Sequence, residues 1–221
     1  MNPQRRSALA ALTSLALAIA ATPLRAADKV PREGTEYRLV SPPQSADDRA
    51  RVEVIEFFSY ACPHCFSFEP LIMSWSKQLP ADVVLRRVPV LFRPDWIPVA
   101  MLYYTLEVLD ELGRMHQVVF NAIHKEKQNL STPAGVADFM ERNGVPRNKF
   151  TETYSSFAVQ TRTQRSGKLQ SAYKVDEVPM MAVDGLFVTS NSMVGGAHEA
   201  VFPVLDYLIG EARKRRKLSK T

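Results

Sequence analysis

Cysteine and glycine are both scarce in this sequence of 221 residues, which has only 2 Cys and 9 Gly. Two cysteines cannot build a disulfide-dense scaffold, and so little glycine excludes a collagen-like repeat. With 46% hydrophobic and 23% charged residues, the chain has the composition of a globular protein rather than a disordered one. The length suits one domain, or one domain with an insertion, and allows a sizeable core.

An excess of positive charge is missing from the body of the chain. The formal net charge is +5, but three arginines lie within the first 26 residues and six basic residues lie between Arg213 and Lys220. Positions 27–210 hold 19 basic and 22 acidic residues, a net charge of −3. A nucleic-acid-binding protein needs a basic folded surface, so we expect no nucleic-acid partner. We interpret the basic run near the C-terminus as a frayed, solvated helix end.

The one long apolar run is too short for a membrane anchor. Arg5 and Arg6 precede an apolar stretch from Ser7 to Ala21, about fifteen residues against the roughly 20 that span a bilayer. Leu24-Arg25-Ala26 then supplies a small residue at a cleavage position. We therefore predict a signal peptide over residues 1–26, with cleavage near Ala26, and export to a compartment where disulfides persist.

The first half of the mature chain has the pattern of a β-α-β unit. V-E-V-I-E-F-F over 52–58 predicts a buried strand, and 83–92 predicts a second one. Between them, apolar residues recur at helical spacing after Cys62. The two strands should therefore pair in parallel. A short edge strand is possible at 37–40.

About eighty residues without a strand signal follow. Helical periodicity predicts helices over 98–112, 115–124, 134–143, 146–155 and 158–173. Strands return at 180–183 and 187–189, joined by Asp184-Gly185, a dipeptide typical of a two-residue hairpin. A final helix begins near His198. The chain is therefore predicted to have an α/β fold in which a block of helices interrupts a sheet.

Cys62-Pro63-His64-Cys65 is the motif that carries chemistry. A structural zinc site needs four ligands, and the sequence holds no third cysteine. The only neighbouring histidines, His116 and His124, are predicted to lie on the surface of the helical block. We therefore expect no metal.

Two other uses of a C-x-x-C pair fit poorly. Haem attachment requires histidine directly after the second cysteine, where Phe66 stands. A structural disulfide would close a ring of four residues and stabilise the fold little. At a strand-to-helix junction in an exported protein, the pair is better interpreted as a redox-active disulfide that needs no cofactor.

The position of the two cysteines predicts different roles for them. Cys62 falls at a helix N-terminus, where unpaired N–H groups and the helix dipole stabilise a thiolate. His64 can add a donor or a positive charge beside it. A stabilised thiolate favours the reduced form and makes the disulfide a stronger oxidant. Cys65, one turn deeper, should be the buried resolving thiol, and Cys62 the one that a partner reaches.

The run from Glu56 to Cys65, followed by Phe68-Glu69, resembles the DsbA family of bacterial periplasmic disulfide oxidases. The resemblance covers nearly the whole mature chain, and Pro63-His64 between the cysteines distinguishes this family from reducing thioredoxins. It implies a thioredoxin fold with an inserted all-helical domain. We expect the thioredoxin-like domain at 27–93 and 174–221, and the helical domain at 94–173.

The resemblance also implies further site residues. Pro179 should follow a cis peptide bond against the active-site sulfurs, and Val178 should offer its backbone to substrate. Glu56 should be a buried acid beneath Cys65 that relays its proton, although an edge-strand glutamate facing water is the alternative. The family often has lysine where Arg87 stands here. Whether Arg87 and Glu69 join the charge network around Glu56, or Glu69 is merely solvated, stays open.

The resemblance implies a monomeric periplasmic enzyme that donates its Cys62–Cys65 disulfide to newly exported proteins with free thiols. An inner-membrane, quinone-linked oxidase of the DsbB type would reoxidise it. A disulfide isomerase or reductase is the alternative within redox chemistry, but roughly 25 mature residues before the first strand leave no room for the isomerases' dimerisation domain. The alternative outside redox chemistry is a non-catalytic peptide-binding chaperone.

Overall fold

The structure is a computed structural model that describes residues 30–218. The predicted signal peptide lies outside these residues. The strands are β1 (Arg38–Leu39), β2 (Val52–Phe58), β3 (Val83–Pro89), β4 (Met180–Val183) and β5 (Phe187–Ser190). The helices are α1 (Pro63–Ser76), α2 (Ile97–Val108), α3 (Leu112–His124), α4 (Pro133–Arg142), α5 (Arg147–Tyr154), α6 (Phe157–Ala172) and α7 (Val201–Leu218). Short 3-10 helices are η1 (Pro94–Trp96), η2 (Ser192–Val194) and η3 (His198–Ala200).

The five strands form one mixed sheet in the order β1-β5-β4-β2-β3. β2 lies inside the sheet, parallel to β3 and antiparallel to β4, and all seven of its residues are buried. The predicted parallel pair and the predicted edge strand are both confirmed. β3 ends three residues earlier than predicted because Pro89 pairs with Phe58, the last residue of β2. Beyond that point the neighbouring strand no longer exists.

Helices cover both faces of the sheet. On one face, Val52 and Val54 of β2 pack with Phe68 of α1 and Leu205 of α7. On the other face, Ile55 and Phe57 pack with Tyr173 and the end of α6. The period-two alternation of β2 therefore decides which side chain meets which helix, and it turns Glu56 towards α1.

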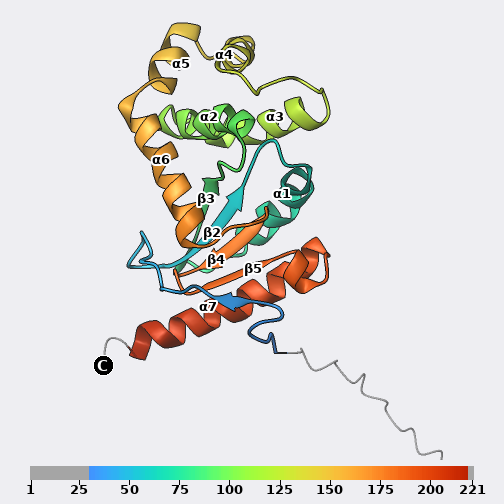
Figure 1. Ribbon diagram of the computed structural model, residues 1–221, viewed down its shortest axis with the longest axis vertical. Coiled ribbons are helices and arrows are strands. Elements are labelled where there is room, and N and C mark those ends of the chain that lie inside the picture. Colours follow the sequence, from blue (N-terminus) through green and yellow to red (C-terminus); the bar gives the residue numbers. More distant parts are fainter. Residues whose placement is uncertain (1–29, 219–221) are drawn as a thin grey trace, which may run out of the picture.

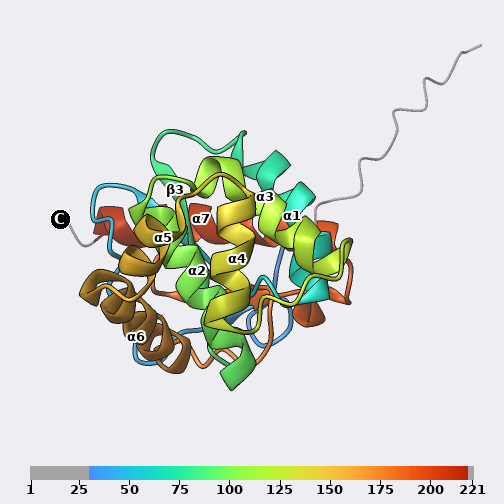
Figure 2. The same cartoon turned by 90° about the horizontal axis from the view of Figure 1, so that it is seen from above.

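The helices between β3 and β4 form a layer of their own. In Figure 1, α2, α3, α4 and α5 lie together above the sheet, α6 descends along one side, and α7 runs beneath. Figure 2 looks down on this layer and shows it over the rest of the chain. Thr132 caps α4 by accepting a hydrogen bond from the backbone N–H of Gly135, as Thr132-Pro133 predicts. Among the described residues, no helix has the length and apolarity to cross a membrane.

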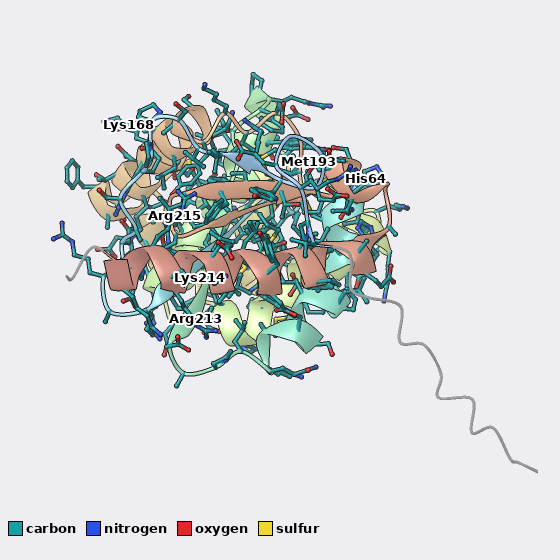
Figure 3. The ribbon with its side chains drawn as sticks, turned by 90° about the horizontal axis from the view of Figure 1, so that it is seen from below. His64, Lys168, Met193, Arg213, Lys214 and Arg215 are labelled. Atoms are coloured by element: carbon teal, nitrogen blue, oxygen red, sulfur yellow. The ribbon has the colours of Figure 1, made fainter. Side chains whose placement is uncertain are left out.

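The basic run near the C-terminus is better ordered than predicted. α7 continues to Leu218, Arg213 forms an ion pair with Asp82 (2.7 Å), and Arg216 pairs with Asp184. The guanidinium of Arg215 lies 4.8 Å from the ring centre of Phe187. Figure 3 shows Arg213, Lys214 and Arg215 along α7, far from His64. The expectation of a frayed, solvated end is wrong for Arg213 and Arg216, which find carboxylate partners on the loops of the sheet, whereas Lys214, Arg215 and Lys217 are exposed and Lys220 lies outside the described residues.

The hairpin between β4 and β5 depends on one glycine. Asp184 and Gly185 both have positive φ, of 55° and 70°, the combination that a type I′ turn requires. The backbone N–H of Gln44 donates to the carbonyl of Gly185 at 2.9 Å. A Cβ on residue 185 would lie only 1.8 Å from the carbonyl oxygen of Gln44. The turn therefore excludes any side chain at this position.

We predict that Gly185→Ala lowers the free energy of unfolding by about 2 kcal/mol or more, through steric conflict and a left-handed backbone. Gly210→Ala is the matched control. Gly210 lies in α7 with open space around its Cβ position, so alanine should stabilise the helix by about 0.5–1 kcal/mol. Urea unfolding measures both, and equal effects of the two changes would contradict the account.

Candidate active site

The two cysteines lie at the junction between β2 and α1. Cys62 is the N-cap residue of α1, with extended backbone angles, and Pro63 occupies the first turn. The side chains of Pro63 and His64 are exposed. Both cysteines are free thiols; Cys62 is 6% exposed and Cys65 is fully buried. The predicted difference in depth between the two sulfurs is confirmed.

The environment moves the pKa values of the two thiols in opposite directions. A hydrogen bond from the Cys65 thiol, opposed by desolvation, and the backbone N–H groups of Cys65 and His64 lower the pKa of Cys62 to about 6. The charge of His64 contributes a smaller effect in the same direction. Burial raises the pKa of Cys65 well above its usual range. At pH 7, Cys62 is therefore mostly a thiolate and Cys65 a neutral thiol.

Val178-Pro179 lies against these sulfurs, as the resemblance implies. The peptide bond is cis, and Sγ of Cys62 is 3.5 Å from the carbonyl oxygen of Val178. Pro179 is buried and Val178 half-buried, directly before β4. This carbonyl is close enough to the reactive sulfur to contact whatever is bonded to it.

A buried group of charges lies beneath the cysteines. Glu56, in the middle of β2, is fully buried and accepts a hydrogen bond from Nε of Arg87 at 2.9 Å. Nη2 of Arg87 also donates to both carboxylate oxygens of Glu69, at 3.0 and 3.2 Å. Arg87 and Glu69 therefore both join the network around Glu56, and neither a solvated Glu69 nor an edge-strand Glu56 fits.

Burial governs the ionisation of Glu56. Desolvation raises the pKa of Glu56 to about 7, against the opposing charge of Arg87, and the nearby Glu69 carboxylate adds to the rise. The charge of Glu56 in turn helps to raise the pKa of the Cys65 thiol. Glu56 and Cys65 are thus electrostatically coupled, and each favours the protonated form of the other.

Three residues outside the predicted site also contact it. The Tyr60 side chain, 1% exposed, has its hydroxyl 2.6 Å from Nδ1 of His116. Nε2 of His124 lies 2.8 Å from the backbone oxygen of Tyr60, and the His124 ring stacks on Phe66 with ring centres 4.8 Å apart. The prediction that His116 and His124 lie on the surface is wrong, because α3 packs its histidine face against the active-site loop.

The sequence did contain a signal for these histidines. His116, Phe120 and His124 are spaced four residues apart on α3, so they share one face of the helix. Phe120 is fully buried, and its burial would have placed both histidines beside the core. The partner that they meet, Tyr60, is remote in sequence and could not be identified from this spacing.

A pocket of about 290 Å³ opens beside the buried charges, between α1, β3, α2 and α3. Glu69, Arg87 and His116 line it together with the exposed Gly113 and Gln117. Within residues 30–218, no three His, Cys, Asp or Glu side chains are arranged to hold a metal ion.

Comparison with known proteins agrees with this geometry. The sequence profile of the DSBA-like thioredoxin domain matches residues 53–202. The thiol:disulfide interchange protein DsbA of Bordetella parapertussis is 39% identical over 199 residues, which cover 90% of this chain and 95% of that protein. The protein of the same name from Pseudomonas aeruginosa is 41% identical over 184 residues, which cover 83% and 87% of the two chains.

Solved structures confirm the fold. The crystal structure of Pseudomonas aeruginosa DsbA superposes with a TM-score of 0.79 at 41% identity, over 83% of this chain and 95% of that one. DsbA from Xylella fastidiosa gives a TM-score of 0.78 at 28% identity, over 84% and 99%. The predicted thioredoxin fold with inserted helices is therefore correct, and the chain belongs to the DSBA-like thioredoxin domain family.

Proposed function

We propose that this chain is a periplasmic thiol:disulfide oxidase that donates its Cys62–Cys65 disulfide to newly exported proteins. The observation that carries the proposal is the contrast between the two thiols: Cys62 has its pKa lowered to about 6 and Cys65 has its pKa raised. Such a pair is more stable when reduced than an ordinary pair of thiols, so its disulfide tends to pass on to a partner.

The reaction exchanges one disulfide for another. A substrate thiolate attacks Sγ of Cys62, the Cys62–Cys65 bond breaks, and Cys65 leaves as a thiolate that takes a proton. A second substrate thiolate then attacks the substrate sulfur of the mixed disulfide, and Cys62 leaves as a thiolate. Two electrons pass from the substrate dithiol to the enzyme, and no cofactor takes part.

We assign a role in this disulfide exchange to each of the neighbouring residues. Glu56 delivers the proton to the leaving Cys65 sulfur, because it is buried beside it with a raised pKa. Pro63 opens α1, and His64 stabilises the Cys62 thiolate. The Val178 carbonyl, held by Pro179 at 3.5 Å from Sγ of Cys62, aligns the substrate backbone next to the mixed disulfide.

The wider setting follows from the family. The reduced enzyme needs an oxidant, which we assign to a quinone-linked, DsbB-like protein of the inner membrane. We propose a monomer in which residues 27–93 and 174–221 form the catalytic domain and residues 94–173 form the helical one. Replacing both cysteines distinguishes this proposal from a peptide-binding chaperone, which would keep its function. Equilibration with glutathione distinguishes an oxidase from a reductase or isomerase.

We predict that Cys65→Ala traps substrate on Cys62 as a stable mixed disulfide. The reason is that Cys62 is the less buried, low-pKa sulfur, 6% exposed against 0% for Cys65, and that Cys65 is no longer present to resolve the intermediate. Mass spectrometry identifies the adduct after incubation with a disulfide-bonded peptide, because the Cys62 thiolate attacks that disulfide, binds one half and releases the other half as a thiol. In the reduced wild type, iodoacetamide at pH 7 should modify Cys62 first, and preferential modification of Cys65 would refute the assignment.

We predict that Glu56→Gln slows thiol exchange at pH 7 and stabilises the oxidised protein. A carboxyl whose pKa is raised in the folded state binds its proton more tightly there than in the unfolded chain. The destabilising effect of the ionised Glu56 carboxylate on the folded state is therefore absent near pH 4 and grows as the pH rises through about 7. Above pH 7, the free energy of unfolding of Glu56→Gln should exceed that of the wild type by about 1–3 kcal/mol.

Glu53→Gln is the matched control for the exchange rate. Glu53 is buried on the opposite face of β2 and paired with Arg86 at 2.7 Å, but it is not part of the group beneath Cys65. It should leave the rate of exchange unchanged. A rate that is insensitive to Glu56→Gln, or equally sensitive to both changes, would argue against proton delivery by Glu56.

We predict that the reduced protein melts at a higher temperature than the oxidised one, and that His64→Ala narrows the gap. The folded Cys62 pKa is depressed, so the stabilisation is present above the unfolded thiol pKa and is lost as the pH falls through about 6. Calorimetry of both forms between pH 5 and pH 9 tests this. His64→Ala should also shift the redox equilibrium up to about tenfold, roughly 30 mV, towards the disulfide.

A disulfide form that melts well above the reduced form at pH 7 would point instead to a structural disulfide or a reductant.

A further inference from the structure

The buried charges beneath the active site do not balance. Glu56 and Glu69 share the single guanidinium of Arg87, and all three side chains are largely shielded from water. Two ionised carboxylates would leave an uncompensated negative charge in the interior, which is costly. One proton is therefore held by the pair of carboxylates, and its location decides whether it is available to Cys65.

The contacts of the two carboxylates are unequal. Both oxygens of Glu69 accept hydrogen bonds from Nη2 of Arg87, whereas only Oε2 of Glu56 accepts one, from Nε. Oε1 of Glu56 is buried without a hydrogen-bond partner. A protonated carboxyl needs fewer donors than a carboxylate does. The donor count alone thus favours the proton on Glu56.

His116 further increases the difference in nearby donors between Glu69 and Glu56. Its buried Nε2 forms no well-aligned hydrogen bond and lies 3.3 Å from Oε2 of Glu69, within ion-pair distance, while its Nδ1 lies 2.6 Å from the Tyr60 hydroxyl. Because a carboxylate can only accept, we assign the proton to Nε2 and let the Tyr60 hydroxyl donate to Nδ1. Tyr60 thereby fixes the tautomer that presents an N–H group to Glu69.

We propose that His116 is a positioning residue for the proton: it keeps Glu69 ionised, so that the proton shared by the two carboxylates resides on Glu56, next to Cys65. This inference rests on the proposed role of Glu56 as proton donor and adds the residue that directs the proton to it. His116 itself touches neither substrate nor the reacting sulfurs, and it belongs to α3 in the inserted helices.

The surroundings of His116 suit this role. The groups that face it are Glu69 from α1, Arg87 from β3, Tyr60 after β2, and the Tyr103 ring of α2, 6.2 Å away between ring centres. Burial lowers the pKa of His116, against the raising effect of Glu69. The ring therefore stays neutral at pH 7. The pocket that His116, Glu69 and Arg87 line gives this group contact with solvent for proton exchange.

The test reads the titration of the two carboxyls directly. In the oxidised full-length mature protein, carbon-13 NMR of labelled glutamate side chains should show Glu56 titrating near pH 7. His116→Phe keeps a ring but removes the N–H group that faces Glu69. Loss of this contact to the Glu69 carboxylate should lower the Glu56 midpoint by about one pH unit.

Two further variants make the result specific. His116→Gln can accept from Tyr60 and donate to Glu69, so it should restore the wild-type midpoints. His124→Phe is the matched control, because His124 bonds the carbonyl of the same Tyr60 from the same helix without contacting Glu69. It should leave both midpoints unchanged, whereas a general loosening of the Tyr60 loop would make it act like His116→Phe.

Kinetics provide a second readout. If Glu56 is the proton donor, the pH above which thiol exchange slows should fall by about one unit in His116→Phe and return in His116→Gln. If His116→Phe does not fold, Glu69→Gln tests the same competition. Glu69→Gln leaves Arg87 to Glu56 alone, so the Glu56 midpoint should fall, and an unchanged midpoint would contradict the shared proton.

Unchanged carboxyl midpoints in His116→Phe, or equal shifts in His124→Phe, would overturn the inference. Shifted midpoints with no change in exchange kinetics would instead overturn the proposed role of Glu56 and leave the role of His116 in placing the proton intact. The two failures are therefore distinguishable.

Discussion

The start of α1 is the feature on which the rest of this structure depends. A helix that begins at Pro63 leaves free N–H groups beside Cys62 and turns Cys65 into the core three residues later. Two identical side chains thereby acquire opposite environments, one close to water and donors, the other desolvated. Neither the sheet nor the inserted helices carry out thiol chemistry themselves, but both are needed to hold this helix terminus against Val178.

The sheet supplies the second constraint, the position of acid beneath the sulfurs. Because β2 is an interior strand, its alternate side chains are buried on both faces, and both Glu53 and Glu56 need an arginine from β3. On Glu53's face, Arg86 pairs with Glu53 and with Asp47, and Arg165 also pairs with Asp47, so two cations face two carboxylates. On the other face, Arg87 alone forms ion pairs with two carboxylates, those of Glu56 and Glu69. The surplus carboxylate costs stability unless one of the two carboxylates is protonated, and the function proposed above uses that proton for the Cys65 sulfur.

The inserted helices do more than cover one end of the sheet. α3 reaches the active-site loop at both polar ends of Tyr60, through His116 and His124, and its aromatic face packs on Phe66 in the first turn of the catalytic helix. The loop that carries the reactive cysteine is therefore held between two layers that are far apart in the sequence. A change in the packing of α3 would reach the thiols through these contacts.

The sequence alone determined the local features: the buried run of β2, the helix that follows Cys62, the hairpin at Asp184-Gly185 and the redox character of the motif. These follow from residues that are neighbours along the chain, where periodicity and turn chemistry act. It left the charge network open and placed His116 and His124 on the surface. Arg87 lies 31 residues from Glu56 along the chain, and Tyr60 lies 56 and 64 residues from His116 and His124. Strand register and helix packing therefore brought these groups together. Only the tertiary structure could decide which buried charge meets which donor, because pairing across elements leaves no periodic trace in a single sequence.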